Sequence, residues 1–335
     1  MNSAPTTRCR TIPSALRRWI CLFLICAGAI ESPLCRGAEN FPDWLFPVAP
    51  AASNPTPQDS THRLSNRHSR LHYTQTELND PFNAPDWFPE SHDAMPEVVA
   101  DGRKPDVLAC AFCHTPTGQG RPENASLAGL SSAYIARQLE EFRGGTRKQE
   151  GPVAYAPVRA MVEIASHLTD EEIRIAADYF SKQALHRRVE VKESENLPCV
   201  KPALWIYLKS DGCEGEPLGM RLIELAPDKA PHELRDESMV YVAIVPVGSI
   251  ARGQALSHEG DAARACSTCH GEKLHGTDIA PSLAGRSPTS LLRQLLAFQQ
   301  HTRMGERAVL MQPVVENMSM SDMIAAAAYA ASLDP

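Results

Sequence analysis

The sequence predicts a mainly α-helical protein in which one small helical domain occurs twice, joined by a small antiparallel β insertion. Three observations support this fold class. A Cys-x-x-Cys-His pentapeptide occurs twice, the residues around it repeat at a fixed spacing, and a β-rich stretch lies between the copies. The chain has 335 residues, which is enough for about two domains. Its formal net charge of −7 argues against nucleic-acid binding, so we expect no nucleic-acid partner.

Residues 1–38 are predicted to form a secretory signal peptide. Four arginines (Arg8, Arg10, Arg17 and Arg18) precede an apolar core that runs from Trp19 to Ile30. Cleavage is expected after Ala29 or after Ala38. The alternative is an uncleaved membrane anchor, although this core is shorter than the ~20 residues that span a bilayer. A cleaved signal peptide predicts a periplasmic protein.

Residues 39–96 are rich in proline and lack helical periodicity, so they predict an extended arm. The arm contains two similar tripeptides, Pro42-Asp43-Trp44 and Pro85-Asp86-Trp87. We expect the two tryptophans to hold the arm against the domains by burying aromatic surface. Docking of a partner on one of them is the alternative.

The two pentapeptides are Cys110-Ala111-Phe112-Cys113-His114 and Cys266-Ser267-Thr268-Cys269-His270. This is the attachment pattern of c-type haem. Two thiols at this spacing can bond to the two vinyl groups of a porphyrin, and the adjacent histidine then binds the iron. A zinc half-site and a redox dithiol are the alternatives, but zinc needs further ligands and a dithiol needs no histidine. The sequence therefore predicts two covalently attached haem c groups, with iron bound by His114 and His270.

The sequence repeats beyond these motifs. A shift of 156 residues aligns the first copy with the second, and after an insertion in the first copy the shift becomes 150. The aligned pairs are Leu127-Ala128-Gly129 with Leu283-Ala284-Gly285, Arg137-Gln138-Leu139 with Arg293-Gln294-Leu295, Phe142 with Phe298, Arg147 with Arg303, Met161 with Met311, and Tyr179 with Tyr329. Haem attachment does not itself require these matches, so they indicate that one domain was built twice.

The second part of the alignment predicts the remaining iron ligands, Met161 and Met311. Each methionine is expected to follow a non-helical approach and to precede a helix, and the helices start at the capping sequences of Thr169 and Ser319. Histidine and methionine together close the iron site and raise its reduction potential. The alternatives are that the methionines fill the core, or that His167 and His301 are the ligands.

Four helices follow from apolar periodicity and capping signals. They are expected at Ser131–Phe142, Ile173–Gln183, Pro288–Gln300 and Met323–Leu333. Their apolar faces are expected to pack toward the haem or against each other. Arg137 and Arg293 are either surface charges or partners of the haem propionates, and the sequence leaves both uses open.

Residues 187–249 form the β-rich connector. Strands are predicted at Val189–Lys192, Leu204–Leu208, Met220–Leu225 and Met239–Val245. If cleavage follows Ala38, Cys199 and Cys213 are the cysteines that remain after haem attachment, and in an oxidising compartment they are disulfide candidates. Closing their loop would contribute about 3 kcal/mol in the chain-entropy model. The alternative is that one of the two thiolates binds a haem iron.

With these residues in view, the chain resembles a class I cytochrome c with two haem domains, similar to the periplasmic di-haem cytochrome c-four type. The resemblance rests on both pentapeptides, Leu-Ala-Gly, the Tyr134-Ile135-x-Arg137-Gln138-Leu139 stretch and the methionines, and it covers roughly 97–185 and 250–335. It implies a small helical fold around each haem, at 97–186 and 250–335. It also implies that the carbonyl of Pro281 faces His270, with Ala125 at the equivalent position. The first copy has Thr115 where the family has a glycine such as Gly271.

Two classes of function remain. The resemblance implies an electron carrier between a dehydrogenase or quinol-linked donor and a downstream acceptor such as an oxidase, with redox proteins as partners. The negative charge would favour a basic patch on such a partner. The alternative is a di-haem oxidoreductase, either peroxidase-like or a sulfur-compound dehydrogenase, with one exchangeable haem ligand. Catalysis needs acid–base groups near an open iron, and the sequence offers no such cluster, so no catalytic residue is assigned.

Overall fold

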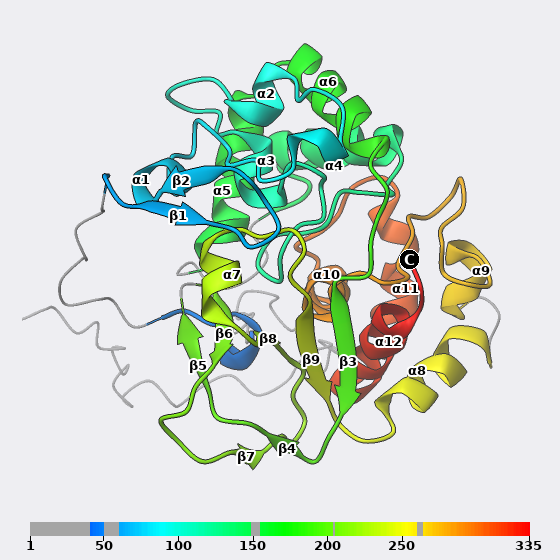
Figure 1. Ribbon diagram of the computed structural model, residues 1–335. Helices are drawn as coiled ribbons and strands as arrows, with labels where there is room; N and C mark the ends of the chain where they lie inside the picture. The colour runs from blue at the N-terminus through cyan, green and yellow to red at the C-terminus, as the bar shows by residue number, and fades with distance from the viewer. Residues whose placement is uncertain (1–40, 50–59, 149–154, 204, 260–263) are drawn as a thin grey trace, which may run out of the picture. The chain divides into compact units, whose positions relative to one another are not determined.

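A computed structural model describes residues 41–49, 60–148, 155–203, 205–259 and 264–335 (Figure 1). The expected signal peptide, residues 1–38, lies outside the described residues, as does Leu204 of a predicted strand. No helix in the described ranges is both long and apolar enough to cross a membrane.

The first copy folds into short helices, and those at 132–143 and 170–181 lie where the sequence predicts helices. The helices are α2 (Glu97–Ala100), α3 (Cys110–His114), α4 (Ser132–Arg143), α5 (Ala156–His167) and α6 (Asp170–Ser181). The capping box at Thr169 is confirmed, because its hydroxyl accepts from the N–H of Glu172 while the carboxylate of Glu172 accepts from the N–H of Thr169. Ile135 of α4 and Phe180 of α6 pack into one buried core.

The second copy repeats this plan. Its elements are α8 (Ser249–His258), α9 (Cys266–His270), α10 (Pro288–Gln299), η3 (Ala308–Leu310), α11 (Gln312–Val315) and α12 (Met320–Ser332). The capping box at Ser319 is confirmed, with Asp322 as its partner. Helix α8 crosses α12 at Gly253, where a Cβ atom would lie 2.0 Å from the carbonyl oxygen of Ala325. Only glycine allows the two backbones to approach this closely.

The approach to Met161 differs from the prediction. Residues 156–160 form the first turns of α5, although a non-helical approach was expected. Pro157 stands in the first turn of this helix, where its missing N–H leaves no intrahelical bond unmade, so the proline starts the helix and does not interrupt it. The approach in the second copy also differs from the prediction, because Ala308–Leu310 form the 3₁₀-helix η3; Met311 follows it and precedes α11.

The carboxylate of Glu172 joins the start of α6 to Arg103, whose Nε donates to it over 2.8 Å. The hydrogen bond from Arg103, together with those from Thr169, outweighs partial burial and lowers the pKa of Glu172 to about 2. A carboxyl group whose pKa is lower in the folded state stabilises the fold above its ordinary pKa, and this stabilisation is lost as the pH falls toward the folded value.

We therefore expect Glu172→Gln to lower the unfolding temperature at neutral pH. The variant should also lose less stability than the parent protein between about pH 4.5 and about pH 2. Thermal unfolding across this range measures both effects. Glu140→Gln, on the exposed surface of α4, is the matched control. The interpretation would fail if the two variants showed the same pH dependence.

The segment expected to be an extended arm contains regular structure. It holds η1 (Asp43–Leu45), β1 (Arg63–Ser65), β2 (His72–Thr74), α1 (Gln75–Leu78) and η2 (Pro89–Ser91). A single capped turn such as α1 is too short to show helical periodicity in a sequence. The expected role of the tryptophans is confirmed, since Trp87 is 2% exposed and Trp44 packs against two apolar clusters.

The inserted segment forms a mixed sheet, so the prediction of an antiparallel sheet was wrong. Its strands are β3 (Val189–Glu193), β5 (Val200–Ala203), β6 (Ile206–Lys209), β8 (Ile223–Ala226) and β9 (Tyr241–Val245), in the order β3-β9-β8-β6-β5. The β3–β9 and β6–β8 pairs are parallel, and the other two pairs are antiparallel. The chain leaves β3, passes through the other strands and α7 (Lys229–Glu233), and returns along β9. Such a long connection allows strands to run in the same direction.

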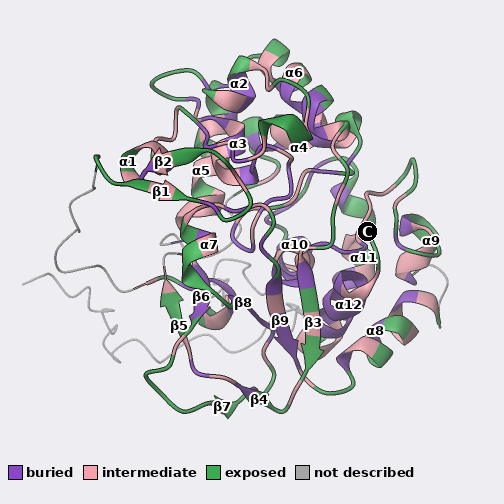
Figure 2. Ribbon diagram, in the orientation of Figure 1, coloured by how far each residue is buried: buried purple, intermediate pink, exposed green. Residues whose placement is uncertain are grey.

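The sheet lies against the second copy of the repeat (Figures 1 and 2). Ala243 of β9 and Val189 of β3 pack with Ala331 of α12 in a small buried cluster. A second pair of short strands, β4 (Asn196–Leu197) and β7 (Glu216–Pro217), extends from the sheet. The predicted disulfide between Cys199 and Cys213 is confirmed and joins the residue just before β5 to the loop before β7.

Candidate haem-binding sites

The two predicted proximal histidines have the same surroundings. His114 is 8% exposed and its Nδ1 lies 2.7 Å from the carbonyl oxygen of Ala125. His270 is 6% exposed and its Nδ1 lies 2.7 Å from the carbonyl oxygen of Pro281. A carbonyl can only accept, so Nδ1 carries the proton and Nε2 keeps its lone pair for a metal. The contacts that the resemblance implied for Ala125 and Pro281 are therefore both present.

Burial also favours the neutral imidazole, which is the form that binds iron. Desolvation lowers the pKa of His114, and the hydrogen bond to Ala125 only partly opposes this effect. Burial likewise lowers the pKa of His270, and the hydrogen bond to the carbonyl of Pro281 only partly opposes this shift. Each ring is thus oriented by a carbonyl, and burial favours its neutral form, in which Nε2 is available to bind a metal.

Each pair of motif cysteines lies on the same short helix as its histidine, α3 in the first copy and α9 in the second. All four thiols are free of disulfide bonds. Burial raises the pKa of the Cys110 thiol to about 12 and also raises that of Cys266. The residues present therefore fit a haem c group at each motif, with two free thiols and an oriented imidazole.

The residue after each histidine adopts a backbone conformation that favours glycine. Thr115 has φ 68° and ψ 155°, and Gly271 has φ 83° and ψ 157°. This region costs other residues of the order of 1–3 kcal/mol. Thr115 is held there in part by its hydroxyl, which accepts from the N–H of Gln119 over 3.2 Å.

We expect Gly271→Ala to lower the free energy of unfolding by about 1–3 kcal/mol. The added Cβ would lie 3.4 Å from its nearest neighbour, the carbonyl oxygen of Gly276, so the cost is conformational and not steric. Urea unfolding of the haem-loaded protein measures it. Gly212→Ala is the control, because its Cβ would meet nothing closer than 3.7 Å and its φ is not positive. Equal losses in the two variants would contradict the argument.

The methionines lie on other elements than the histidines. Met161 is half-buried within α5, and Met311 is half-buried and packs against Phe298, Ala308 and Val315. The alternative ligand His167 lies at the surface, where its Nε2 is 3.4 Å from a carboxylate oxygen of Glu163. The other alternative, His301, is also exposed.

Aligned residues of the two copies meet each other. The guanidinium of Arg147 donates to Gln138 and to Gln294, both over 2.9 Å. Arg303 donates to Gln294 over 2.7 Å and to Gln138 over 2.6 Å. Each arginine therefore binds the glutamine of its own copy and that of the other copy. The sequence shows these residues as repeats but does not predict that they contact each other. The available signal in the sequence was that these arginines and glutamines repeat although haem attachment does not require them.

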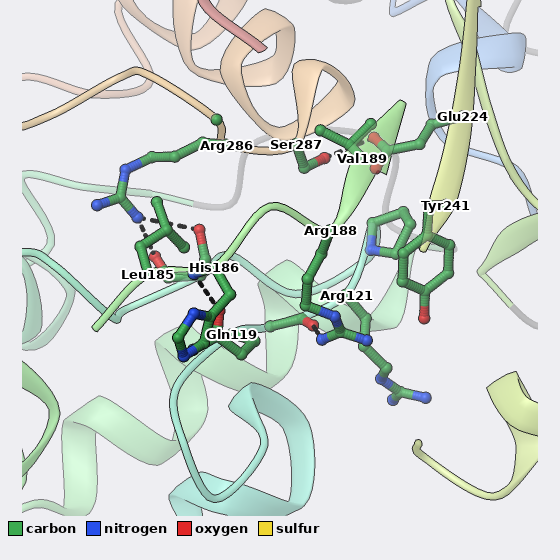
Figure 3. A pocket seen from close by; sticks show the side chains of 14 residues that line it. Gln119, Arg121, Leu185, His186, Arg188, Val189, Glu224, Tyr241, Arg286 and Ser287 are labelled. Carbon is green, nitrogen blue, oxygen red and sulfur yellow. Dashed lines mark hydrogen bonds between the residues drawn. The ribbon is translucent and has the colours of Figure 1, made fainter. Parts of the chain in front are cut away.

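A second contact between the copies lies beside a small cavity (Figure 3). Arg286 is 7% exposed and donates to the carbonyl oxygens of Ser126 over 3.1 Å and Ala128 over 2.9 Å. The cavity has a volume of about 20 Å³ and is also lined by Glu224 and Ser287, which are hydrogen-bonded to each other over 2.6 Å. This is space for about one water molecule and is far below the few hundred Å³ of ordinary ligand pockets.

Arg293, which sequence analysis left open, is buried at the edge of this region. It is 6% exposed and donates to the carbonyl oxygens of Leu45 and Pro122. Its guanidinium lies over the rings of Phe46 and Tyr155 at 5.1 and 4.6 Å. Arg293 therefore ties the arm and the first copy to α10. In the described part of the chain, no group of three or more His, Cys, Asp or Glu residues is placed to hold a metal ion.

Comparison with known proteins places the chain among cytochromes. No family model matches it. It is 35% identical over 77 residues to the thiosulfate dehydrogenase electron acceptor of Stutzerimonas stutzeri, which covers 23% of this chain and 33% of that protein. It is 35% identical over 103 residues to cytochrome c4 of Pseudomonas aeruginosa, covering 28% and 48%. The matches thus span half or less of these relatives.

A third relative is matched over most of its length. Cytochrome c-554(548) of Halomonas halodenitrificans is 36% identical over 78 residues, which cover 23% of this chain and 87% of that protein. Among solved structures, reduced recombinant cytochrome c4 from Pseudomonas stutzeri is 20% identical, with a TM-score of 0.42, over 67% of this chain and 93% of the other.

The chain therefore belongs to the c-type cytochromes. With its two attachment motifs it is a two-domain, cytochrome c4-like di-haem protein, and its cofactors are two covalently attached haem c groups.

Proposed function

We propose that this protein is a periplasmic electron-transfer protein with two haem irons, each bound by a histidine and a methionine. Residues 97–186 and 250–335 form the two haem domains, with 187–249 as an inserted connector. The attachment and ligand residues are Cys110, Cys113, His114 and Met161 in the first domain, and Cys266, Cys269, His270 and Met311 in the second. The observation that carries the proposal is the doubled arrangement of a buried histidine, its carbonyl partner and two free thiols.

The protein's own residues hold and tune the sites. The carbonyls of Ala125 and Pro281 orient the two imidazoles so that Nε2 points away from the hydrogen bond. Met161 and Met311 would each supply a sulfur ligand that completes the coordination of the iron. The haem supplies one-electron chemistry, and a closed site exchanges electrons without exchanging ligands.

We infer that the electron donor is a dehydrogenase. Two relatives are named thiosulfate dehydrogenase electron acceptors, and one of them, from Thiomonas intermedia, is 25% identical over 235 residues, or 68% of this chain and 80% of that protein. Transfer to a downstream acceptor, for example an oxidase, would complete the pathway. The apolar stretch from Trp19 to Ile30 would direct export.

The test is the optical spectrum of the reduced protein with and without carbon monoxide, together with a count of covalent haems per chain. Two haems and no carbon monoxide complex would support the carrier. A carbon monoxide complex at one haem of the unaltered protein would contradict it, and would favour the alternative of a di-haem oxidoreductase with an exchangeable ligand.

A further inference from the structure

The two haem-attachment loops, residues 111–124 and 267–280, differ sharply in exposure although they are copies of each other. Cys113 is half-buried, whereas the matching Cys269 is exposed. Glu123 is 8% exposed, and its counterpart Ile279 is 58% exposed. In Figure 2 exposed and half-buried residues dominate at α9 and in the loop that follows it. The two loops align residue by residue at a shift of 156. Comparison with the second loop therefore shows which residues of the first loop are covered by other parts of the chain.

The cover comes from the inserted segment. Residues 234–237, which follow α7, are called the cap here. The guanidinium of Arg235 lies 3.8 Å from the ring centroid of Phe112 and donates to the carbonyl oxygen of Phe112 over 2.6 Å. Glu237 accepts from both the N–H and the hydroxyl of Thr117, each over 2.9 Å. Two cap side chains thus contact the haem-attachment loop on either side of His114.

The cap is fixed from behind by two further segments. Arg188, beside β3, donates to the carbonyl oxygens of Asp236 over 3.0 Å and of Gly120 over 2.8 Å. The indole of Trp87 donates to the carbonyl oxygen of Leu234 over 2.6 Å. Both the inserted segment and the arm therefore hold the cap on the first loop.

Burial of the second motif cysteine matters for electron transfer. A thioether bond joins its sulfur to the porphyrin, so the conjugated ring begins within a few bonds of that sulfur. The exposed Cys269 would therefore place this edge of the second haem at the surface, whereas the half-buried Cys113 and the cap would shield that of the first. We propose that the cap closes the first haem to protein partners, so that the protein exchanges electrons with them at the second haem. This proposal rests on the proposed function of electron transfer.

The surface around the second motif suits such a partner. Ile279, Val309 and Leu310 are 58%, 45% and 57% exposed. Arg307 donates to the carbonyl oxygen of Asp278 over 3.0 Å, which joins the two loops that carry them. The loop that contains Ile279 also carries exposed charges of both signs, such as Glu272 and Lys273. The complementary partner is a redox protein with an apolar docking face and a rim of mixed charge, as in small, transient redox complexes.

Each encounter moves one electron. The partner's metal centre is oxidised by one unit while the second iron goes from Fe(III) to Fe(II), or the reverse, and no bond is made or broken. A second electron reaches the first iron only through the second domain.

The first experiment measures the cap itself by amide hydrogen exchange in the haem-loaded protein. The N–H of Thr117 is expected to be protected in the parent protein and to lose this protection in Glu237→Ala. Arg235→Ala is expected to raise exchange across residues 111–124 and to leave residues 267–280 unchanged. Unaltered exchange in both variants would overturn the cap.

The second experiment measures electron transfer by stopped flow, with a reduced, soluble blue-copper protein as the donor. Replacing both Ile279 and Leu310 by lysine is expected to lower the second-order rate constant about tenfold, equivalent to about 1.4 kcal/mol in the docking step. Met220→Lys is the matched control, because Met220 is 56% exposed on the inserted segment, and its rate should stay within about twofold. If the variant with lysine at both Ile279 and Leu310 reacted at the parent rate, the assignment of the second haem as the exchange site would be overturned.

The two proposals fail in different ways. If no protein donor reduces either haem, the proposed function is wrong, whatever the exchange data show. If transfer is fast and Arg235→Ala accelerates it more than tenfold, partners can reach the first haem when the cap is weakened. This outcome would confirm the cap as the barrier at the first haem. If transfer is fast and the lysine variant equals the parent protein, electron transfer stands and the choice of haem is wrong.

Discussion

Met311→Ala is expected to open the second haem iron to carbon monoxide while both haems stay covalently attached. The sulfur of Met311 is proposed to close that iron, and its removal would leave a coordination position that small ligands can fill. Histidine–methionine ligation raises the potential of a haem, so the potential of the second haem should fall. We expect a fall of at least about 59 mV, which is tenfold in a one-electron equilibrium. Spectral titration with carbon monoxide and potentiometry measure the two effects.

The neighbouring methionines provide a demanding control. The sulfur of Met304 accepts a hydrogen bond from Gln312, the residue next to Met311, over 2.6 Å. Met304 and Met318, which packs against the same apolar cluster as Met311, are therefore the rival ligands to exclude. Met304→Ala and Met318→Ala should leave the spectrum unchanged. If Met304→Ala opens the iron and Met311→Ala does not, the ligand assigned from the repeat is wrong.

The same substitution in the first domain has the same expected result. Met161→Ala should open the first iron and lower its potential, although Met161 lies within a helix and not on a loop. The doubled experiment also identifies which potential belongs to which haem. Potentials that stay unchanged in both variants would refute both ligand assignments.

Gly253→Ala is expected to lower the free energy of unfolding of the second domain by about 3 kcal/mol. A Cβ at this position would lie 2.0 Å from the carbonyl oxygen of Ala325 and 2.6 Å from the Cβ of Tyr329. The first contact is with backbone, so side-chain movement cannot relieve it and α8 must move away from α12. This cost exceeds the roughly 1 kcal/mol that alanine gains over glycine in a helix.

Urea unfolding followed by circular dichroism measures the loss, and Gly212→Ala is again the control. The control should change stability by no more than about 0.5 kcal/mol. Because the haem is covalently attached, a weakened domain keeps its cofactor and the unfolding can be followed to completion. Equal stability of the Gly253→Ala variant and the parent protein would mean that the helices do not cross as closely as the structure shows.

The sequence by itself determined those features that depend on nearby residues or on direct repetition. The capping boxes at Thr169 and Ser319 are contacts between residues three positions apart, so the local amino-acid sequence is enough to predict them. The contact of each histidine with a carbonyl bridges a separation of 11 residues within one loop. The disulfide of Cys199 and Cys213 followed from counting thiols after haem attachment, and its loop is also short.

Tertiary structure decided what depends on contacts between distant segments. Strand direction in the inserted sheet is set by the path of the connections, which alternating hydrophobicity does not encode. Arg235 reaches Phe112 across a sequence separation of 123, and Glu237 reaches Thr117 across 120. Neither contact leaves a periodic signal, because a single side chain makes it. The two haem-attachment motifs are thus equivalent in the sequence, and only the folded chain leaves Cys113 half-buried and Cys269 exposed.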